Sequence, residues 1–260
     1  MKKRLMALFV NVGPSLIAAI VLVIAWDVFI RVYDIIDLVA PSPWEMLSEI
    51  QRDSKTLSLA CLLTGKAALC GLMASVIAGT AIGFLFSQVA WLRRAFYPYA
   101  IFLQTVPIVA VAPILVLWIG NGIESVIAVS FILGLFPIIT NVTSGMMSIP
   151  SEMIELFQIN RANVWQRFIK LQFPFTVPFL LTGVKIAGGL TVIGAIVGEF
   201  FVGYGNQGKG LGYLIRQSVE MHRTPQLFAV VFLSTLLGVF FFVLTSCLDT
   251  IILRKWSDRT

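Results

Sequence analysis

Residues 203–210 are the stretch of this sequence that comes nearest to a nucleotide-binding loop. They read GYGNQGKG and contain GxxxxGK, the first part of a loop that binds phosphates. A complete loop continues with Ser or Thr after the lysine, whereas Gly210 follows Lys209 here. The stretch also follows a long apolar segment rather than a short buried strand. We therefore interpret it as a glycine-rich surface loop without a nucleotide.

Polar residues inside apolar segments are the second group that could do chemistry. Lys185 and Glu199 lie 14 residues apart in one apolar segment, which puts them on one helix face but about 21 Å apart along the axis. They cannot pair with each other. Charges at such positions usually face a protein interior or a water-filled path, although Lys185 could instead snorkel and Glu199 could be a satisfied helix-end residue. Uncharged polar residues in other apolar segments either pack between helices or line a path for a polar solute: Gln104, Thr105, Thr140 and Asn141.

Catalytic and metal-binding constellations are not found in the sequence. His222 is the only histidine, and no Ser/His/Asp set or metal-ligand spacing surrounds it. The three cysteines, Cys61, Cys70 and Cys247, lie in or beside apolar segments without metal spacing, so we interpret them as packing residues. We expect a protein that is not an enzyme and binds no cofactor or metal itself.

The composition indicates the elements that must position these residues. The chain is 58% hydrophobic and 12% charged, with a mean hydropathy of +0.92, whereas soluble domains carry roughly 25% charged residues. Uncharged runs of about 20 residues, the length that crosses a bilayer as a helix, recur along it. We predict an all-α integral membrane protein, a single domain over residues 1–260, with about six transmembrane helices: 12–31, 58–87, 96–119, 124–147, 176–202 and 225–252.

The distribution of basic residues predicts the orientation. With six spans both termini share one side, which would carry eleven lysines and arginines against six on the other. The positive-inside rule therefore predicts cytoplasmic termini. This bias also explains most of the net charge of +6, so no nucleic-acid partner is needed.

Ile149–Pro178 forms a polar island between two apolar segments and reads IPSEMIELFQINRANVWQRFIKLQFPFTVP. Ser151 is a suitable N-cap for a first short helix. Asn160 and Asn163 bracket a predicted break, because asparagine both ends helices and caps new ones. A second short helix follows over Val164–Leu171, before Pro174 and Pro178 at the start of the fifth span. The alternative is an amphipathic loop lying on the inner leaflet, although its two glutamates are atypical of membrane-surface helices.

The polar island resembles the EAA loop of bacterial ABC importer permeases. Glu155 matches the glutamate of that pattern, and Pro174 and Pro178 match its late prolines. Leu156 and Phe157 replace the two alanines, and Arg161 stands where the family has glycine. Because that glycine makes a tight turn, we expect Asn160 to supply the left-handed residue instead.

Further segments extend the resemblance over nearly the whole chain. They are similar to the nitrate/sulfonate/taurine branch of these permeases, and VIGAIVGE also resembles permeases for thiamine-precursor pyrimidines or riboflavin. The segments are LQTVPIVAVAPILVLWIGNG (Leu103–Gly122), FPIITNVTSGM (Phe136–Met146), GVKIAGGLTVIGAIVGEF (Gly183–Phe200) and GKGLGYLI (Gly208–Ile215).

The resemblance implies the permease subunit of a type I ABC importer in a bacterial plasma (inner) membrane. The chain would form a homodimer above two cytoplasmic ATPase subunits, which use ATP with Mg, and below an extracytoplasmic solute-binding protein. Residues 149–175 would be its cytoplasmic helix-turn-helix coupling loop. Its substrate would be of the nitrate, sulfonate, taurine or bicarbonate kind, or a thiamine-precursor pyrimidine. The candidate ATPase-docking residues are Glu152, Glu155, Gln158, Asn160, Arg161, Asn163 and Trp165.

Two roles remain open for other parts of the sequence. Gly208, Gly210 and Gly212 are candidates for an outer loop that contacts the binding protein or gates the path. The alternative function is a self-contained secondary transporter or channel, which would use Lys185 and Glu199 for ion coupling. A membrane-bound enzyme or scaffold is the third class. The polar island and the incomplete nucleotide loop together favour the importer.

Overall fold

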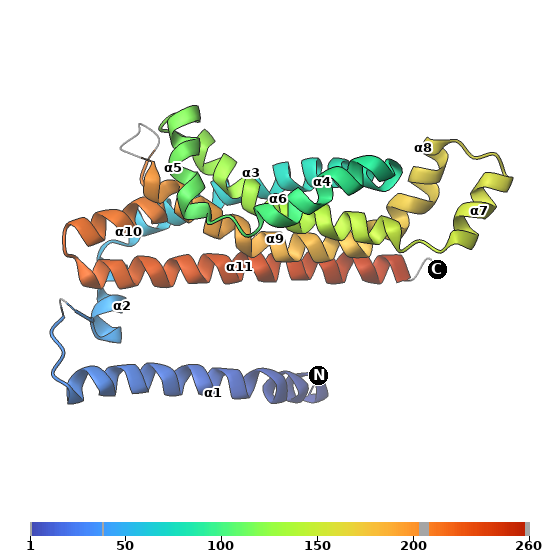
Figure 1. The fold of residues 1–260 in the computed structure, drawn as a ribbon. Helices are drawn as coiled ribbons and strands as arrows, with labels where there is room; N and C mark the ends of the chain where they lie inside the picture. Colours follow the sequence, from blue (N-terminus) through green and yellow to red (C-terminus); the bar gives the residue numbers. More distant parts are fainter. Residues whose placement is uncertain (1, 38, 203–207, 258–260) are drawn as a thin grey trace. The chain divides into compact units, whose positions relative to one another are not determined.

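The computed structural model describes residues 2–37, 39–202 and 208–257, and all its regular elements are helices (Figure 1). The described part of the chain holds no strand, which confirms the predicted all-α class. The elements are α1 (Lys2–Val32), α2 (Pro43–Arg52), α3 (Ser54–Gln88), α4 (Ala90–Leu103), α5 (Ile108–Ile119), α6 (Ile123–Met147), α7 (Ser151–Ile159), α8 (Val164–Arg167), the π-helix η1 (Phe168–Gln172), α9 (Phe173–Phe201), α10 (Leu211–Glu220) and α11 (Thr224–Ser257).

Four helical runs of the described residues are long and apolar enough to cross a membrane. They coincide with four of the predicted spans, and the predicted first span, 12–31, lies within α1. Each run exceeds the roughly 20 residues that a bilayer requires. The four runs are Ser54–Gln88, Ile123–Met147, Val164–Phe201 and Thr224–Leu253.

The predicted span 96–119 is wrong as a single helix, because the chain breaks between α4 and α5. Pro107 is the N-cap of α5 with φ −61° and ψ 112°, outside the helical region. Proline donates no backbone hydrogen bond and disfavours helical geometry in the residue before it. The last turn of α4 tightens, since Thr105 N donates to Phe102 O at 2.9 Å. The 12 residues of α5 are too few to cross a bilayer alone.

The chain divides into two compact units, residues 1–58 with 215–232 and residues 59–214 with 233–260. In the first unit, α2 begins with a capping box: the Ser42 hydroxyl accepts from Glu45 N, and the Glu45 carboxylate accepts from Ser42 N at 2.7 Å. Pro43 stands at the first helical position. Trp44, the second residue of the helix, is exposed.

The second unit is held together by close packing of α3, α6 and α9. A Cβ added to Gly194 on α9 would lie 2.6 Å from Ser130 Cα of α6, and one added to Gly79 on α3 would lie 2.7 Å from Ile138 Cγ2. Small residues therefore let these helices approach closely. Such packing is usual in membranes, where the hydrophobic effect does not drive helices together. Two buried clusters fill the remaining contacts: Ala67, Ala68, Val126, Val192, Ala195 and Phe241, and Leu72, Ile138, Val142, Met146 and Ala187.

Candidate functional site

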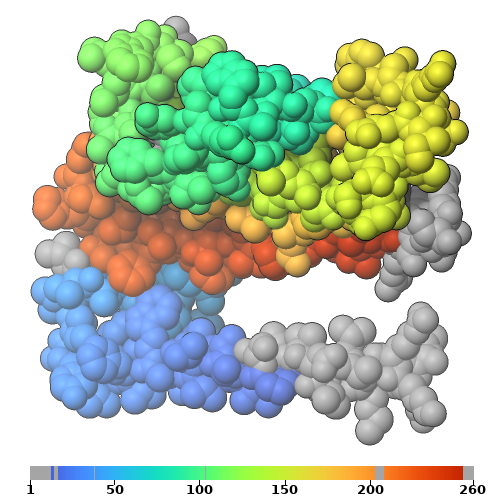
Figure 2. Space-filling model, turned by 45° about the vertical axis from the view of Figure 1, so that its right-hand side comes forward, coloured from blue at the N-terminus to red at the C-terminus, as the bar shows by residue number. Residues whose placement is uncertain are grey.

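The polar island (Ile149–Pro178) forms one end of the second unit, where its residues lie beside the start of α4 (Figure 2). It begins with α7, whose N-cap is Pro150 rather than the predicted Ser151. The Pro150 carbonyl accepts from Met153 N and Ile154 N. The prediction was one residue too late because the rigid proline already sets the extended geometry that a cap requires.

Apolar side chains on the island are left exposed. Ile159 is 79% exposed and Trp165 67% exposed, and Met153, Leu156 and Val164 are also exposed. The candidate docking residues Glu152, Glu155 and Gln158 are exposed too. An apolar patch rimmed by polar side chains is typical of a surface that binds another protein.

The bend between α7 and α8 centres on Arg161, and the expectation that Asn160 takes the left-handed conformation is wrong. Arg161 has φ +50°, whereas Asn160 has φ −80° and ψ 12°. Arg161 N donates to Gln158 O and Ala162 N to Phe157 O, both at 2.9 Å. These two bonds define a Schellman ending, which places its left-handed residue one position after the C-cap. Arg161 therefore keeps the backbone geometry that glycine supplies in the family.

Asn160 and Asn163 stabilise the two sides of this bend. Asn160 Nδ2 donates to Leu156 O at 2.7 Å. Asn163 Oδ1 accepts from Gln166 N at 2.8 Å, and Asn163 N donates to Gln166 Oε1 at 2.9 Å. This reciprocal pair is a capping box that starts α8 as the sequence indicated.

The second short helix does not end before the fifth span. Residues 164–201 form one continuous helical run that passes through Pro174 and Pro178. The run contains a π-helical turn over residues 168–172, in which Phe173 N donates to Phe168 O. Pro174 follows directly, and as a proline it cannot donate to the carbonyl four residues earlier. The prolines that we expected at the start of the span thus lie inside a helix that starts at Val164.

A polar bridge attaches this helix to the end of α3. Arg167 Nη2 donates to Gln88 Oε1 at 2.9 Å, and Gln88 Nε2 donates to Gln172 Oε1 at 3.1 Å. Gln172 is only 6% exposed. Alongside the bridge, the rings of Phe84 and Phe168 pack with centroids 4.3 Å apart. Sequence reasoning missed Gln88, because its partners lie about 80 residues away and no local pattern connects them.

Three of the predicted path residues line one cavity of about 400 Å³. Gln104 follows α4, and Thr140 and Asn141 lie on α6. The hydrogen bonds of Thr140 Oγ1 to Phe136 O at 3.0 Å and of Asn141 Nδ2 to Pro137 O at 2.7 Å orient these two side chains. The other lining residues are apolar: Val106, Ile108, Val111, Ile132, Leu133, Phe136, Pro137, Ile186 and Leu190.

The remaining path candidates lie elsewhere. Thr105 and Lys185 are not among the cavity-lining residues. Thr105 Oγ1 donates to Phe102 O at 2.7 Å. The Lys185 ammonium lies 5.2 Å from the ring centre of Phe242 on α11, a cation–π contact.

Glu199 forms a buried polar site at the start of α10. The carboxylate is 8% exposed and accepts from Thr64 Oγ1 at 2.8 and 2.9 Å and from Gly212 N at 2.9 Å. The Thr64 hydroxyl in turn accepts from Leu211 N at 2.9 Å. A carboxylate at this position suits the positive end of the helix dipole. Glu199 therefore holds the first turn of α10 against α3 and α9.

Close packing around Glu199 explains why positions 210 and 212, two of the three candidate glycines of the outer loop, have no side chain. A Cβ on Gly210 would collide with the Glu199 carboxylate, and one on Gly212 would collide with Ile196 O. Gly208 has φ +99°, a conformation that favours glycine. Residues 203–207 of the incomplete nucleotide loop lie outside the described residues. Among the residues that the structure describes, no three His, Cys, Asp or Glu side chains gather as a metal site.

Comparison with known proteins places this geometry in a family. Residues 71–258 match the family described as "Binding-protein-dependent transport system inner membrane component". The match covers more than half of the chain, so the protein belongs to this family of ABC importer permeases. The predicted resemblance is confirmed at this level.

Individual relatives agree with the family. The formylaminopyrimidine transport permease protein ThiX of Halalkalibacterium halodurans is 38% identical over 189 residues, which are 73% of this chain and 74% of the relative. The riboflavin transport system permease protein RibX of Chloroflexus aurantiacus is 34% identical over 168 residues, 65% of this chain and 61% of the relative. A chain of the inward-facing MetNI methionine ABC transporter shares the fold, with a TM-score of 0.63 and 19% identity over 77% of this chain and 96% of that chain.

Proposed function

We propose that two copies of this chain form the translocation path of a bacterial inner-membrane importer, with both termini in the cytoplasm. The polar island would dock on a cytoplasmic ATPase dimer that uses ATP with Mg, and a solute-binding protein would dock on the opposite side. The exposed apolar side chains of the island carry this proposal, because Ile159 remains 79% exposed and Trp165 remains 67% exposed at one end of the second unit even though Trp165 packs edge-on against Phe168.

The contacts behind the patch support a coupling role. Coupling requires a well-anchored element whose position depends on the state of the ATPase. Arg167, Gln88 and Gln172 tie the island to α3 by hydrogen bonds, and α8 is continuous with α9. A displacement of the patch would therefore move two helices of the second unit together.

Replacement of Glu155 by Ala tests the docking role. Glu155 is exposed on the rim of the patch, and a polar rim contact contributes on the order of 1 kcal/mol, or about fivefold in affinity. We expect Glu155→Ala to lower the amount of co-expressed ATPase subunit that co-purifies with the permease, and Glu155→Arg to lower it further. Glu220→Ala removes an exposed carboxylate that pairs with Arg216 on α10, away from the island, and serves as the control for loss of a surface charge. Unchanged ATPase retention in a well-expressed Glu155→Arg variant would contradict the proposal.

The cavity supports a neutral, polar heterocycle as the substrate class. Its polar lining consists of two carboxamides and one hydroxyl, with no charged side chain among the lining residues. Carboxamides offer both donors and acceptors, which suit the edge of a pyrimidine, and the apolar walls suit its faces. The relatives named for formylaminopyrimidine and riboflavin also favour this class over an inorganic anion.

Replacement of Asn141 by Leu tests the substrate site separately from docking. Loss of one hydrogen bond to a neutral ligand costs about 1 kcal/mol, so we expect roughly a fivefold higher KM for a pyrimidine substrate in reconstituted vesicles. ATPase retention should stay at the wild-type level. Equal transport of the pyrimidine by Asn141→Leu and wild type would contradict the assignment of this cavity, while leaving the docking proposal untouched.

A further inference from the structure

A second recess lies at the island end of the second unit and is distinct from the substrate cavity. It has a volume of about 610 Å³ and lies between the first turns of α4 and the last turns of α6. The recess lies close to the polar island, because Gln88, two residues before α4, accepts a hydrogen bond from Arg167 of the island. The lining residues are Arg93, Arg94, Tyr97, Pro98, Thr143, Ser144, Met147 and Ser148.

The recess carries positive charge that nothing in the described part of the chain neutralises. Arg93 and Arg94 form no ion pair there, and no carboxylate is among the lining residues. Two adjacent guanidinium groups present many donors in a planar arrangement that matches the oxygens of a phosphate. The recess is therefore suited to an anion.

Two of the hydroxyl groups beside the recess are not available to a ligand. Thr143 is 1% exposed, and its Oγ1 is closed to solvent and has no hydrogen-bond partner among the described residues. The neighbouring Ser148 hydroxyl donates to Gly145 O at 2.9 Å. The two arginines are therefore the charged groups that can contact an anion in the recess.

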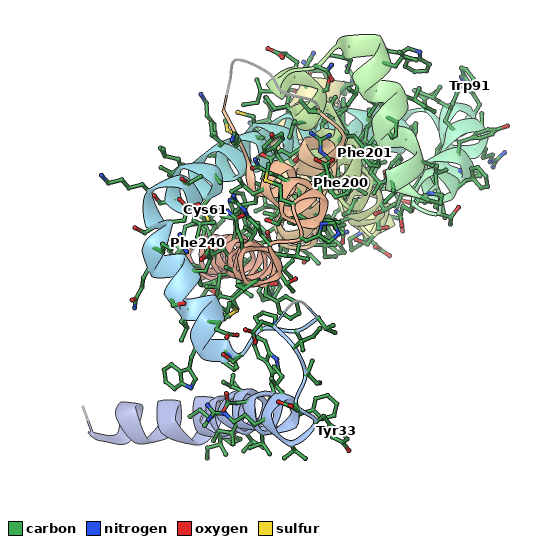
Figure 3. All side chains as sticks on the ribbon, turned by 90° about the vertical axis from the view of Figure 1, so that its left-hand side faces the viewer. Tyr33, Cys61, Trp91, Phe200, Phe201 and Phe240 are labelled. Atoms are coloured by element: carbon green, nitrogen blue, oxygen red, sulfur yellow. The ribbon has the colours of Figure 1, made fainter. Side chains whose placement is uncertain are left out.

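The side chains around the recess indicate that it lies at the depth of the lipid headgroups in the membrane. Trp91 is 68% exposed, and Figure 3 shows it at the outer edge of the second unit. Phe96 and Met147 are exposed as well. Exposed aromatic rings beside arginines at the end of a span are typical of the membrane–water interface. Basic pockets between transmembrane helices on the cytoplasmic side bind the headgroups of anionic lipids.

We propose that this recess binds the phosphate of an anionic phospholipid, with Arg93 and Arg94 as its ligands. On the orientation proposed above, the lipid comes from the cytoplasmic leaflet. The phosphate would join α4 to α6 directly beside the polar island. Lipid composition would then influence how firmly this end of the second unit is packed.

Native mass spectrometry of the purified permease tests the site. Phosphatidylglycerol and phosphatidylcholine of identical chains are offered to the wild type, to Arg93→Gln/Arg94→Gln and to Thr143→Val. We expect selective retention of phosphatidylglycerol by the wild type, with a loss of about fivefold per arginine and about 25-fold for both. Thr143→Val should keep the wild-type selectivity, because the Thr143 hydroxyl is closed off from the recess. Arg161→Gln/Lys170→Gln removes the same charge from the nearby island and should keep the wild-type selectivity.

Several results would overturn the proposal. Equal retention of the two lipids by the wild type would overturn the proposal by itself. This measurement needs no variant, so it holds even if the double variant fails to fold. Equal losses in Arg93→Gln/Arg94→Gln and in Arg161→Gln/Lys170→Gln would show a general charge effect. Complete displacement of phosphatidylglycerol by excess inorganic phosphate would make a free anion the ligand. A changed oligomeric state at unchanged lipid selectivity would assign the two arginines to a protein contact.

Discussion

Replacement of Arg161 by Gly gives a direct measure of the strain in the bend of the polar island. Arg161 has φ +50°, and the left-handed conformation costs a residue with a Cβ roughly 1–2 kcal/mol. Glycine avoids that cost but loses more backbone entropy on folding, by roughly 0.5–1 kcal/mol. The balance predicts that Arg161→Gly stabilises the closed bend by about 0.5–1 kcal/mol, a factor of roughly two to five in its equilibrium constant.

Hydrogen exchange reports this equilibrium directly. The amides of Arg161 and Ala162 donate the two bonds that close the bend, to Gln158 O and Phe157 O. Opening of the bend exposes them to solvent. We expect their exchange to slow by roughly twofold to fivefold in Arg161→Gly, as read by mass spectrometry on a peptide that covers the bend.

Two control variants separate backbone strain from side-chain loss. Arg161→Ala removes the guanidinium but keeps a Cβ in the left-handed conformation, so exchange should not slow. Asn160→Gly should speed exchange, because Asn160 has φ −80° and its side chain holds Leu156 O. Equal protection in Arg161→Gly and Arg161→Ala, or higher protection in Asn160→Gly, would refute the placement of the left-handed residue at Arg161.

Two further predictions concern the contacts that hold the helices of the second unit. Gln88→Leu leaves the buried Gln172 and the half-buried Arg167 without their partner, and an orphaned buried group costs about 1–3 kcal/mol. The thermal unfolding temperature in detergent should therefore fall. Gln88→Glu can still accept from Arg167 and should lose less, and equal losses in the two variants would argue against the bridge. Gly210→Ala places a methyl group against the Glu199 carboxylate and should lower stability by about 1–3 kcal/mol. Gly189→Ala, where a Cβ would meet nothing within 4 Å, is its control, and similar melting temperatures for both variants would contradict the packing at Gly210.

The sequence predicted the helical class and most of the spans because both follow from local signals. An apolar run of sufficient length is read directly, and Ser42 with Pro43 and Glu45 is a complete local cap. The break between α4 and α5 was missed although Pro107 marks it. Prolines also occur inside α6 and α9, where the helix continues. A proline alone therefore does not decide between a kink and a break.

The parts of the site that could not be predicted depend on contacts between distant residues. Glu199 was known to lie in an apolar segment, but its partner Thr64 is 135 residues away. Gln88 likewise receives its role only from Gln172 and Arg167. In the bend, the residue types suggested Asn160 as the left-handed residue, whereas the structure has Arg161 there. The hydrogen bonds that end α7 determine which residue adopts the left-handed conformation, whatever its side chain.

The unbroken helix from Val164 to Phe201 has a mechanical consequence for the importer. Its 38 residues correspond to a rod of about 57 Å at 1.5 Å per residue. One end carries Trp165 on the exposed patch, and the other carries Glu199, which holds the start of α10. If the polar island docks on an ATPase as proposed, a push there would reach the far end of α9 through this one helical run. The π-helical turn at 168–172 interrupts the regular α-helical winding of this run, so the side chains before it face a different direction from those of an uninterrupted α-helix.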